Sequence, residues 1–222
     1  MQMDMQAVAV PTQEAMTPPT ELDMTPDLTG PSEGAPSVRL INVAEFNRLV
    51  ESGFFAPDER VELMEGLLVK MSPNSPLHRT TIYRLARALE QCIGERALVF
   101  TQSPVDLPAP RTQPEPDIAI AKLSGDEYVT RHPRPADLLL VVEVSNTSLA
   151  YDRNNKQRAY AGAGILEYWI VNLNDQILEV HAEPQMTSGG AIYRSKRTLS
   201  SEDEIAPIAF PECRVALKNI FP

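Results

Sequence analysis

The spacing of apolar residues predicts three helices. In residues 43–53 and 78–94 apolar side chains recur every three or four positions, and the two stretches end at Gly53 and Gly94. This spacing gives a helix one apolar face, and glycine is a common helix stop. A third helix is expected over 149–163, ending at one of two nearby glycines.

Apolar runs without helical spacing predict a sheet. Residues 60–72 read as a hairpin that turns at Glu65-Gly66, and the continuous apolar run of residues 137–145 is typical of a central strand buried on both faces. Further strands are expected at 97–107, 117–121, 167–172, 176–182 and 191–197, and a short helical end at 215–221. From 78 to 171 the order is helix, three strands, helix, strand, which predicts an α/β fold with helices flanking a mixed sheet.

Composition divides the chain in two. Residues 1–37 are rich in proline and acidic residues and lack sustained periodicity, so we expect a disordered tail followed by one folded domain over 38–222. The net charge is −10, and the tail, which has six acidic residues and no Lys or Arg, leaves −4 for the domain. DNA-binding proteins usually carry a basic surface, so this balance disfavours tight nonspecific DNA binding. It leaves room for carboxylates that hold a metal ion.

The compartment is predicted from what the chain lacks. Cys92 and Cys213 have no CxxC partner or nearby histidines, so neither a disulfide framework nor a zinc site is expected. No apolar run reaches the roughly 20 residues of a membrane span, and no secretory signal is visible. We therefore expect a protein of the reducing cytoplasm that makes no membrane contact.

Two carboxylates lie at positions that suit metal chemistry. Asp117 opens one predicted strand, and Glu143 lies near the end of the next. If these strands are neighbours, both side chains meet at one edge of the sheet, where they could bind Mg²⁺ for phosphodiester hydrolysis. Taken singly, Asp117 has the alternative of an exposed strand start, and Glu143 that of an ion pair at a strand end.

A candidate cationic partner follows on the predicted helix. Asp152, Lys156 and Tyr160 are four residues apart and so share one face. If this face looks back on the strand, Lys156 can orient the attacking water or stabilise the phosphate. The alternative is an exposed Asp152–Lys156 pair on a solvated helix.

Taken in order, these motifs resemble a known family. The segments VELMEG (61–66), PEPDIAI (114–120), DLLLVVEVSNTS (137–148), DRNNK (152–156) and EYWIVN (167–172) look like the Uma-type putative restriction endonuclease family of the PD-(D/E)XK nuclease superfamily. The resemblance covers roughly residues 40–215. It implies a restriction-endonuclease-like fold.

The resemblance also implies which residues act. Pro116-Asp117 matches the PD element and Glu143 the acidic residue of (D/E)XK. Ser145 stands where the superfamily pattern has lysine; the lysine of the Uma-type proteins lies on the following helix, at the place of Lys156.

The expected protein is then a Mg²⁺- or Mn²⁺-dependent endonuclease that hydrolyses DNA. Asp117, Glu143 and the backbone carbonyl of Val144 would hold the metal, with Lys156 beside the nucleophilic water. A homodimer is expected by analogy alone, since many restriction-type nucleases pair to cut both strands.

Three further residues are accessory candidates, namely Glu62, His78 and Asp152. His78 could approach the metal site, or it could be a helix-start histidine bonded to backbone. Glu62 has the alternative of an exposed hairpin face. Arg79, Arg84 and Arg87 could contact phosphates, although exposed arginines on a solvated helix are common.

A second class of function stays open. The acidic charge and the displaced lysine also suit a nuclease fold that binds or regulates without cutting. No base-reading motif is visible, so the sequence predicts neither a cleavage site nor a choice between double-stranded and single-stranded substrates.

Overall fold

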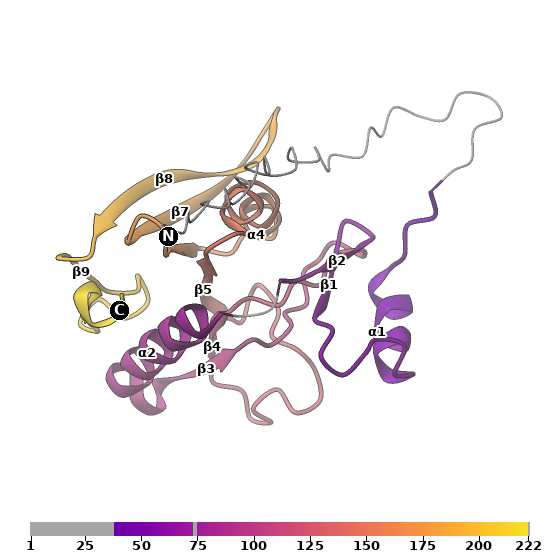
Figure 1. The fold of residues 1–222 in the computed structure, drawn as a ribbon, viewed down its shortest axis with the longest axis horizontal. Helices are drawn as coiled ribbons and strands as arrows, with labels where there is room; N and C mark the ends of the chain where they lie inside the picture. Colours follow the sequence, from indigo (N-terminus) through magenta and orange to yellow (C-terminus); the bar gives the residue numbers. More distant parts are fainter. Residues whose placement is uncertain (1–37, 73–74, 222) are drawn as a thin grey trace, which may run out of the picture. The chain divides into compact units, whose positions relative to one another are not determined.

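The computed structural model describes residues 38–72 and 75–221, and the expected disordered tail, residues 1–37, lies outside them. Its centre is a six-stranded mixed sheet in the order β3-β4-β5-β6-β7-β8 (Figure 1). The strands are β3 (Ala97–Thr101), β4 (Ile118–Lys122), β5 (Leu138–Ser145), β6 (Glu167–Asn172), β7 (Ile177–Thr187) and β8 (Gly190–Ser200). β5 and β6 are parallel, whereas every other neighbouring pair is antiparallel.

Helices begin where the sequence supplies caps. α1 (Val43–Glu51) starts with a capping box between Asn42 and Glu45, and α2 (Pro76–Ile93) has the Ser75 side chain as its N-cap and a proline at its first position. The chain from β5 to β6 runs through α3 (Leu149–Tyr151), a π-helical turn η2 (Asp152–Lys156) and α4 (Gln157–Gly162). Within the described ranges, no helix has both the length and the apolar character that a bilayer span requires.

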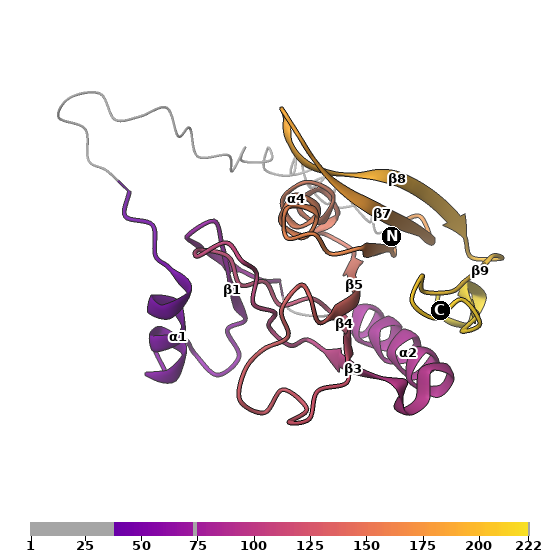
Figure 2. The ribbon, with the colours of Figure 1, turned by 180° about the vertical axis from the view of Figure 1, so that it is seen from behind.

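Helices cover both faces of the sheet. On one face, buried residues of α2 such as Leu85 pack against Leu140, Val142 and Val144 of β5. On the other face, Tyr160 and Ala161 of α4 pack with Val141. Figures 1 and 2 show β5 between these two helices. Because both faces are covered, alternate positions along β5 enter different cores, and all eight of its residues except Leu139 are buried.

Smaller elements complete the fold. The hairpin of β1 (Val61–Met64) and β2 (Leu67–Lys70) turns at Glu65-Gly66, as predicted. After β8, β9 (Glu204–Ile205) pairs with β10 (Val215–Ala216), and a 3-10 turn η3 (Leu217–Asn219) follows. Gly94–Arg96 form a further 3-10 turn, η1, after α2.

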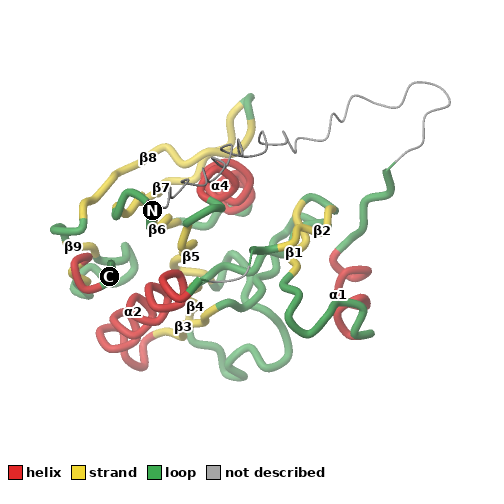
Figure 3. The backbone as a smooth tube through the Cα atoms, in the orientation of Figure 1, coloured by secondary structure: helices red, strands yellow, loops and turns green. Residues whose placement is uncertain are grey.

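The structure confirms the predicted fold class and corrects its details. The strand expected over 97–107 ends at Thr101, and loop, green in Figure 3, follows up to β4. Gln102 ends it because its backbone adopts a left-handed φ of 48°, which breaks the extended chain. The expected 149–163 helix contains a π-helical turn, and the predicted helical end at 215–221 is a short strand followed by a single 3-10 turn.

The expectation for the cysteines is wrong. Cys92 of α2 and Cys213 are joined as a disulfide, with their Cα atoms 5.3 Å apart. The two are separated by 121 positions in sequence, so spacing could not reveal that they are neighbours. Since disulfides persist in oxidising surroundings, this pairing removes one argument for a reducing compartment.

Candidate active site

Asp117, which directly precedes β4, lies next to Glu143 of the neighbouring strand β5. Ile118 of β4 pairs with Val142 of β5 in an antiparallel register, so Asp117, one residue earlier, lies opposite Glu143. Both side chains are buried, and the Val144 amide donates to Asp117 Oδ2 at 2.8 Å. The structure thus brings together the two carboxylates that the strand pattern predicted at one edge.

Lys156 reaches the same place from the π-helical turn. Its Nζ lies 2.9 Å from Glu143 Oε1 and 2.7 Å from Glu62 Oε2, and the side chain is only 2% exposed. A π turn inside a helix frequently marks a functional site, and this one turns Lys156 inward. The exposed helix pair considered as the alternative is therefore excluded.

The burial of Glu143 and Lys156 shifts the pKa values of both side chains. Burial raises the pKa of Glu143 well above its usual value, and Asp152, Asp117 and Glu62 add to the rise against the opposing charge of Lys156. Burial also disfavours the charged form of Lys156, but the carboxylates of Glu143, Glu62 and Asp152 outweigh it and hold the pKa of Lys156 well above its usual value. Lys156 therefore stays protonated, in a pocket rich in carboxyl groups.

Glu62 is a central member of the cluster and does not lie on an exposed hairpin face. It lies on β1 and is 1% exposed. Besides Lys156, it accepts hydrogen bonds from the Glu115 amide and the Tyr151 hydroxyl, both at 3.2 Å. These contacts fix the Glu62 carboxylate in place, with its Oε2 beside the Lys156 ammonium. The β1–β2 hairpin thus supplies a third carboxylate to the site.

Asp152 is buried but hydrogen-bonds to hydroxyls and not to Lys156. Its Oδ2 accepts from Ser145 Oγ and Ser148 Oγ, each at 2.7 Å. Burial raises the pKa of Asp152, against the opposing effects of Lys156 and the two serines. Ser145 occupies the place of the superfamily lysine, and here it anchors the start of the helix that carries Lys156.

His78 and Gln102 flank Asp117. His78 Nε2 lies 3.2 Å from Asp117 Oδ2, so the side chain contacts a carboxylate and not backbone, the alternative considered for it. Gln102 has a left-handed backbone conformation, and its backbone amide donates to the Asp117 carbonyl at 3.1 Å. Its side-chain amide lies 3.4 Å from Asp117 Oδ1. Strained backbone of this kind commonly persists at functional sites.

A pocket of about 490 Å³ opens onto this cluster. Its lining includes none of the candidate arginines but every candidate catalytic, metal-binding and accessory residue named from the sequence: Glu62, His78, Asp117, Glu143, Val144, Asp152 and Lys156. Among residues 38–72 and 75–221, no three acidic, histidine or cysteine side chains come together as a complete metal cage. Mg²⁺ commonly takes only one or two protein carboxylates and completes its shell with water and substrate oxygens.

The donor chemistry fits such a partial site. Four buried carboxyl groups and one ammonium lie in this pocket, and a divalent cation would favour the charged carboxylates that burial alone disfavours. Glu143 Oε1 is engaged by Lys156 and by the Tyr160 hydroxyl at 2.7 Å, whereas Oε2 has no hydrogen bond to any described residue. Asp117 Oδ1 has only the long contact with Gln102. These two oxygens could take a metal ion, and Val144, whose carbonyl is the third predicted ligand, also lines the pocket.

Some residues of the site were not predicted. Tyr151, which hydrogen-bonds to Glu62, gave no signal because its partner lies on a distant hairpin. Tyr160 was placed on the lysine face by its spacing, but its bond to Glu143 could not be foreseen. Among the candidate phosphate-binding arginines, Arg84 donates to the Phe221 carbonyl at 3.2 Å and so is engaged in packing the chain end.

Comparison with known proteins agrees with the fold and the motifs. A family model described as "Putative restriction endonuclease" (Uma2) matches residues 43–218. No curated protein is significantly similar to the chain. A crystal structure of a putative nuclease belonging to DUF820 from Anabaena variabilis superposes with a TM-score of 0.61 at 13% identity, over 82% of this chain and 97% of that one, a likeness of fold alone. Since the family match spans nearly the whole described domain and agrees with the resemblance in the motifs, the chain belongs to the Uma2 family of putative restriction endonucleases.

Proposed function

We propose that this protein is a divalent-metal-dependent endonuclease that hydrolyses phosphodiester bonds of DNA. The observation that carries the proposal is the convergence of Asp117, Glu143 and Lys156 in one pocket, with the Lys156 ammonium 2.9 Å from Glu143. Membership of a family described as restriction endonucleases supports nucleic acid as the substrate. The excess of buried carboxylates supports a cation in the site.

Each residue has a role that follows from its surroundings. Asp117 and Glu143, with the Val144 carbonyl, would hold Mg²⁺ or Mn²⁺, which when bound supplies Lewis acidity and a water of lowered pKa. Lys156 stays protonated and so can donate to the attacking water or to a phosphate oxygen but cannot act as a base. Glu62, Tyr151 and Tyr160 hold that ammonium and its partner carboxylate in place.

A plasmid-nicking assay with Mg²⁺, Mn²⁺ or EDTA tests the proposal. The purified protein should nick supercoiled DNA only with a divalent ion, and Asp117→Asn and Glu143→Gln should each lower the rate by at least about 100-fold, a loss of about 2.7 kcal/mol in transition-state stabilisation. Glu143→Gln keeps the shape of the side chain but removes one partner of the buried Lys156, so a thermal melt of each variant must show that it is folded under the assay conditions.

The matched control is Asp58→Asn, which removes the same charge from an exposed position outside the site. It should nick at the wild-type rate. Nicking that persists in EDTA, or that survives both site substitutions, would contradict the assignment.

A non-cleaving binding or regulatory protein is the second candidate. The observation in its favour is that Lys156 is already engaged by two carboxylates in this structure. Calorimetry separates the two: a nuclease should bind Mn²⁺ in a way that Asp117→Asn abolishes. A protein that binds DNA but neither binds Mn²⁺ there nor nicks belongs to the second class.

A further inference from the structure

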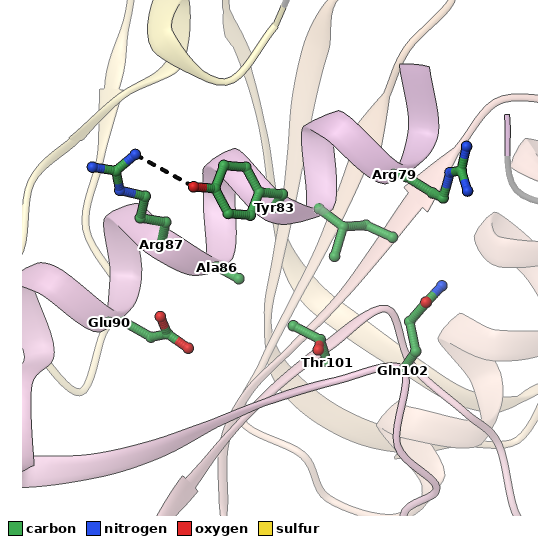
Figure 4. Close-up of a pocket in the computed structure, with 8 residues that line it drawn as sticks. Arg79, Tyr83, Ala86, Arg87, Glu90, Thr101 and Gln102 are labelled. Carbon is green, nitrogen blue, oxygen red and sulfur yellow. Dashed lines mark hydrogen bonds between the residues drawn. The ribbon is translucent and has the colours of Figure 1, made fainter. Parts of the chain in front are cut away.

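A second groove lies beside the candidate active site, between α2 and β3, an edge strand of the sheet. It encloses about 570 Å³. Ile82 and Ala86, which are almost fully buried, lie at its base. Figure 4 shows Arg79 near Gln102 at one end, Arg87 and Glu90 at the other, and Tyr83 between the arginines.

The groove leads to the candidate active site. Arg79 directly follows His78, whose ring contacts Asp117. At the end of β3, Gln102 lines the groove and also lies 3.4 Å from the Asp117 carboxylate. A molecule seated along α2 with its end at Arg79 would therefore have its next part at the proposed metal ligands.

Three exposed side chains give the groove a specific chemistry. Arg79, Tyr83 and Arg87 are four residues apart and so form one stripe along α2, about 12 Å long. Tyr83 is 61% exposed, an unusual amount for an aromatic residue, and its hydroxyl accepts a hydrogen bond from Arg87 at 3.4 Å. A cation on each side of an exposed ring suits phosphates on each side of a stacked base.

The charge balance favours a single strand over a duplex. Binding that follows the duplex backbone depends on many cations, whereas the domain carries a net charge of −4 and the groove offers two arginines. Stacking on an aromatic ring adds affinity without further charge, but it needs a base that is not already stacked in a helix. Glu90, which follows Arg87 on α2 at the far end of the groove, repels phosphate and so ends the binding stripe at Arg87.

We propose that this groove binds single-stranded DNA, with one unpaired base stacked on Tyr83 and phosphates bound by Arg79 and Arg87, and that it leads the strand to Asp117. The proposal rests on the proposed function, because it takes the pocket at Asp117 as the place to which the strand leads. It adds to that function a class of substrate, single-stranded DNA.

Fluorescence anisotropy with a labelled single-stranded oligonucleotide tests this, in EDTA so that no cleavage occurs. The single strand should bind more tightly than a blunt duplex of the same sequence. Tyr83→Ala should weaken single-strand binding by about 5- to 100-fold, whereas Tyr83→Phe, which keeps the ring, should stay within about twofold. Arg79→Ala and Arg87→Ala should each reduce the slope of log affinity against log salt by about 0.7.

Arg158→Ala is the matched control, because Arg158 is exposed on α4, the helix that covers the other face of the sheet. It should bind like wild type. No single-strand binding at low salt, equal or tighter binding of the duplex, or an unaffected Tyr83→Ala would overturn the inference, whatever the cleavage assay shows. Intact single-strand binding through Tyr83, without any nicking, would count against the proposed nuclease and leave the groove assignment standing.

Discussion

At the scale of the residue, Lys156 is the group on which the site's ionisation depends. Its ammonium lies between Glu62 and Glu143 with almost no solvent contact. The mutual attraction of buried charges offsets their desolvation only while all partners are present, and the loss of one leaves the others uncompensated. The residue proposed to act on the substrate is thus also a residue on which folding depends.

Lys156→Met should therefore destabilise the protein, by about 3–5 kcal/mol near pH 8. Lys156 lowers the pKa of Glu143 against burial, so its removal raises that pKa further. A carboxyl group whose pKa is higher in the folded state takes up a proton on folding, and the stability this gives is lost as the pH rises above the unfolded value, 4.5 for glutamate. The pKa of Glu143 is raised in the wild type too, so the cost should grow as the pH rises past the wild-type folded-state pKa, and urea denaturation at several pH values should show this growth.

Two variants control this prediction. Glu143→Gln combined with Lys156→Met should recover part of the lost stability, because one uncompensated carboxylate is gone. Lys218→Met, at an exposed position, should change the free energy of unfolding by less than about 0.5 kcal/mol. A cost for Lys156→Met that does not change with pH would contradict the account.

At the scale of the element, the β1–β2 hairpin positions Glu62 through a tight turn. Glu65 and Gly66 have φ values of 51° and 88°, the left-handed pair that a two-residue hairpin turn needs. A Cβ atom on Gly66 would come within 2.7 Å of Leu40 Cβ and 3.2 Å of the Ile41 carbonyl oxygen. The turn is thus packed against the segment that precedes α1.

Gly66→Ala should lower the free energy of unfolding by about 2–4 kcal/mol, the sum of left-handed strain and overpacking. Gly53→Ala is a matched control, because Gly53 has a similar φ of 69° but nothing within 4 Å of the added Cβ. It should cost only about 1 kcal/mol. Chemical denaturation of both variants measures the difference, and equal costs would show that packing at Leu40 contributes nothing.

The elements also show how far the sequence could predict the site. Asp117 and Glu143 could be paired only on the condition that their two strands are neighbours, and the resemblance to a family implied the same pair; the β4–β5 register meets that condition. Lys156 followed from helical spacing and from the resemblance to a family. Glu62 and Tyr151 could not be joined, because their contact depends on how a distant hairpin docks. The end of β3 just before Gln102 could not be predicted either, since a left-handed glutamine has no sequence signature.

At the scale of the whole molecule, the C-terminal segment closes the core on the α2 face. Buried apolar side chains from this segment pack there, namely Phe210, Cys213, Val215, Leu217, Ile220 and Phe221. Arg84 of α2 binds the Phe221 carbonyl, and Cys92 of α2 binds Cys213. The helix that carries His78 and the proposed binding stripe is therefore fixed in place by the chain end.

The disulfide between Cys92 and Cys213 should make stability depend on redox conditions. It closes a loop of 121 positions, and the loss of chain entropy in the unfolded state would stabilise the fold by up to about 5 kcal/mol. Thermal melting should show a lower Tm with dithiothreitol than without it, and the Cys92→Ser/Cys213→Ser variant should melt like the reduced protein under both conditions. Thiol titration of the denatured, unreduced protein should find no free cysteine; two reactive thiols together with an unchanged Tm would mean that packing alone holds the C-terminal segment on α2.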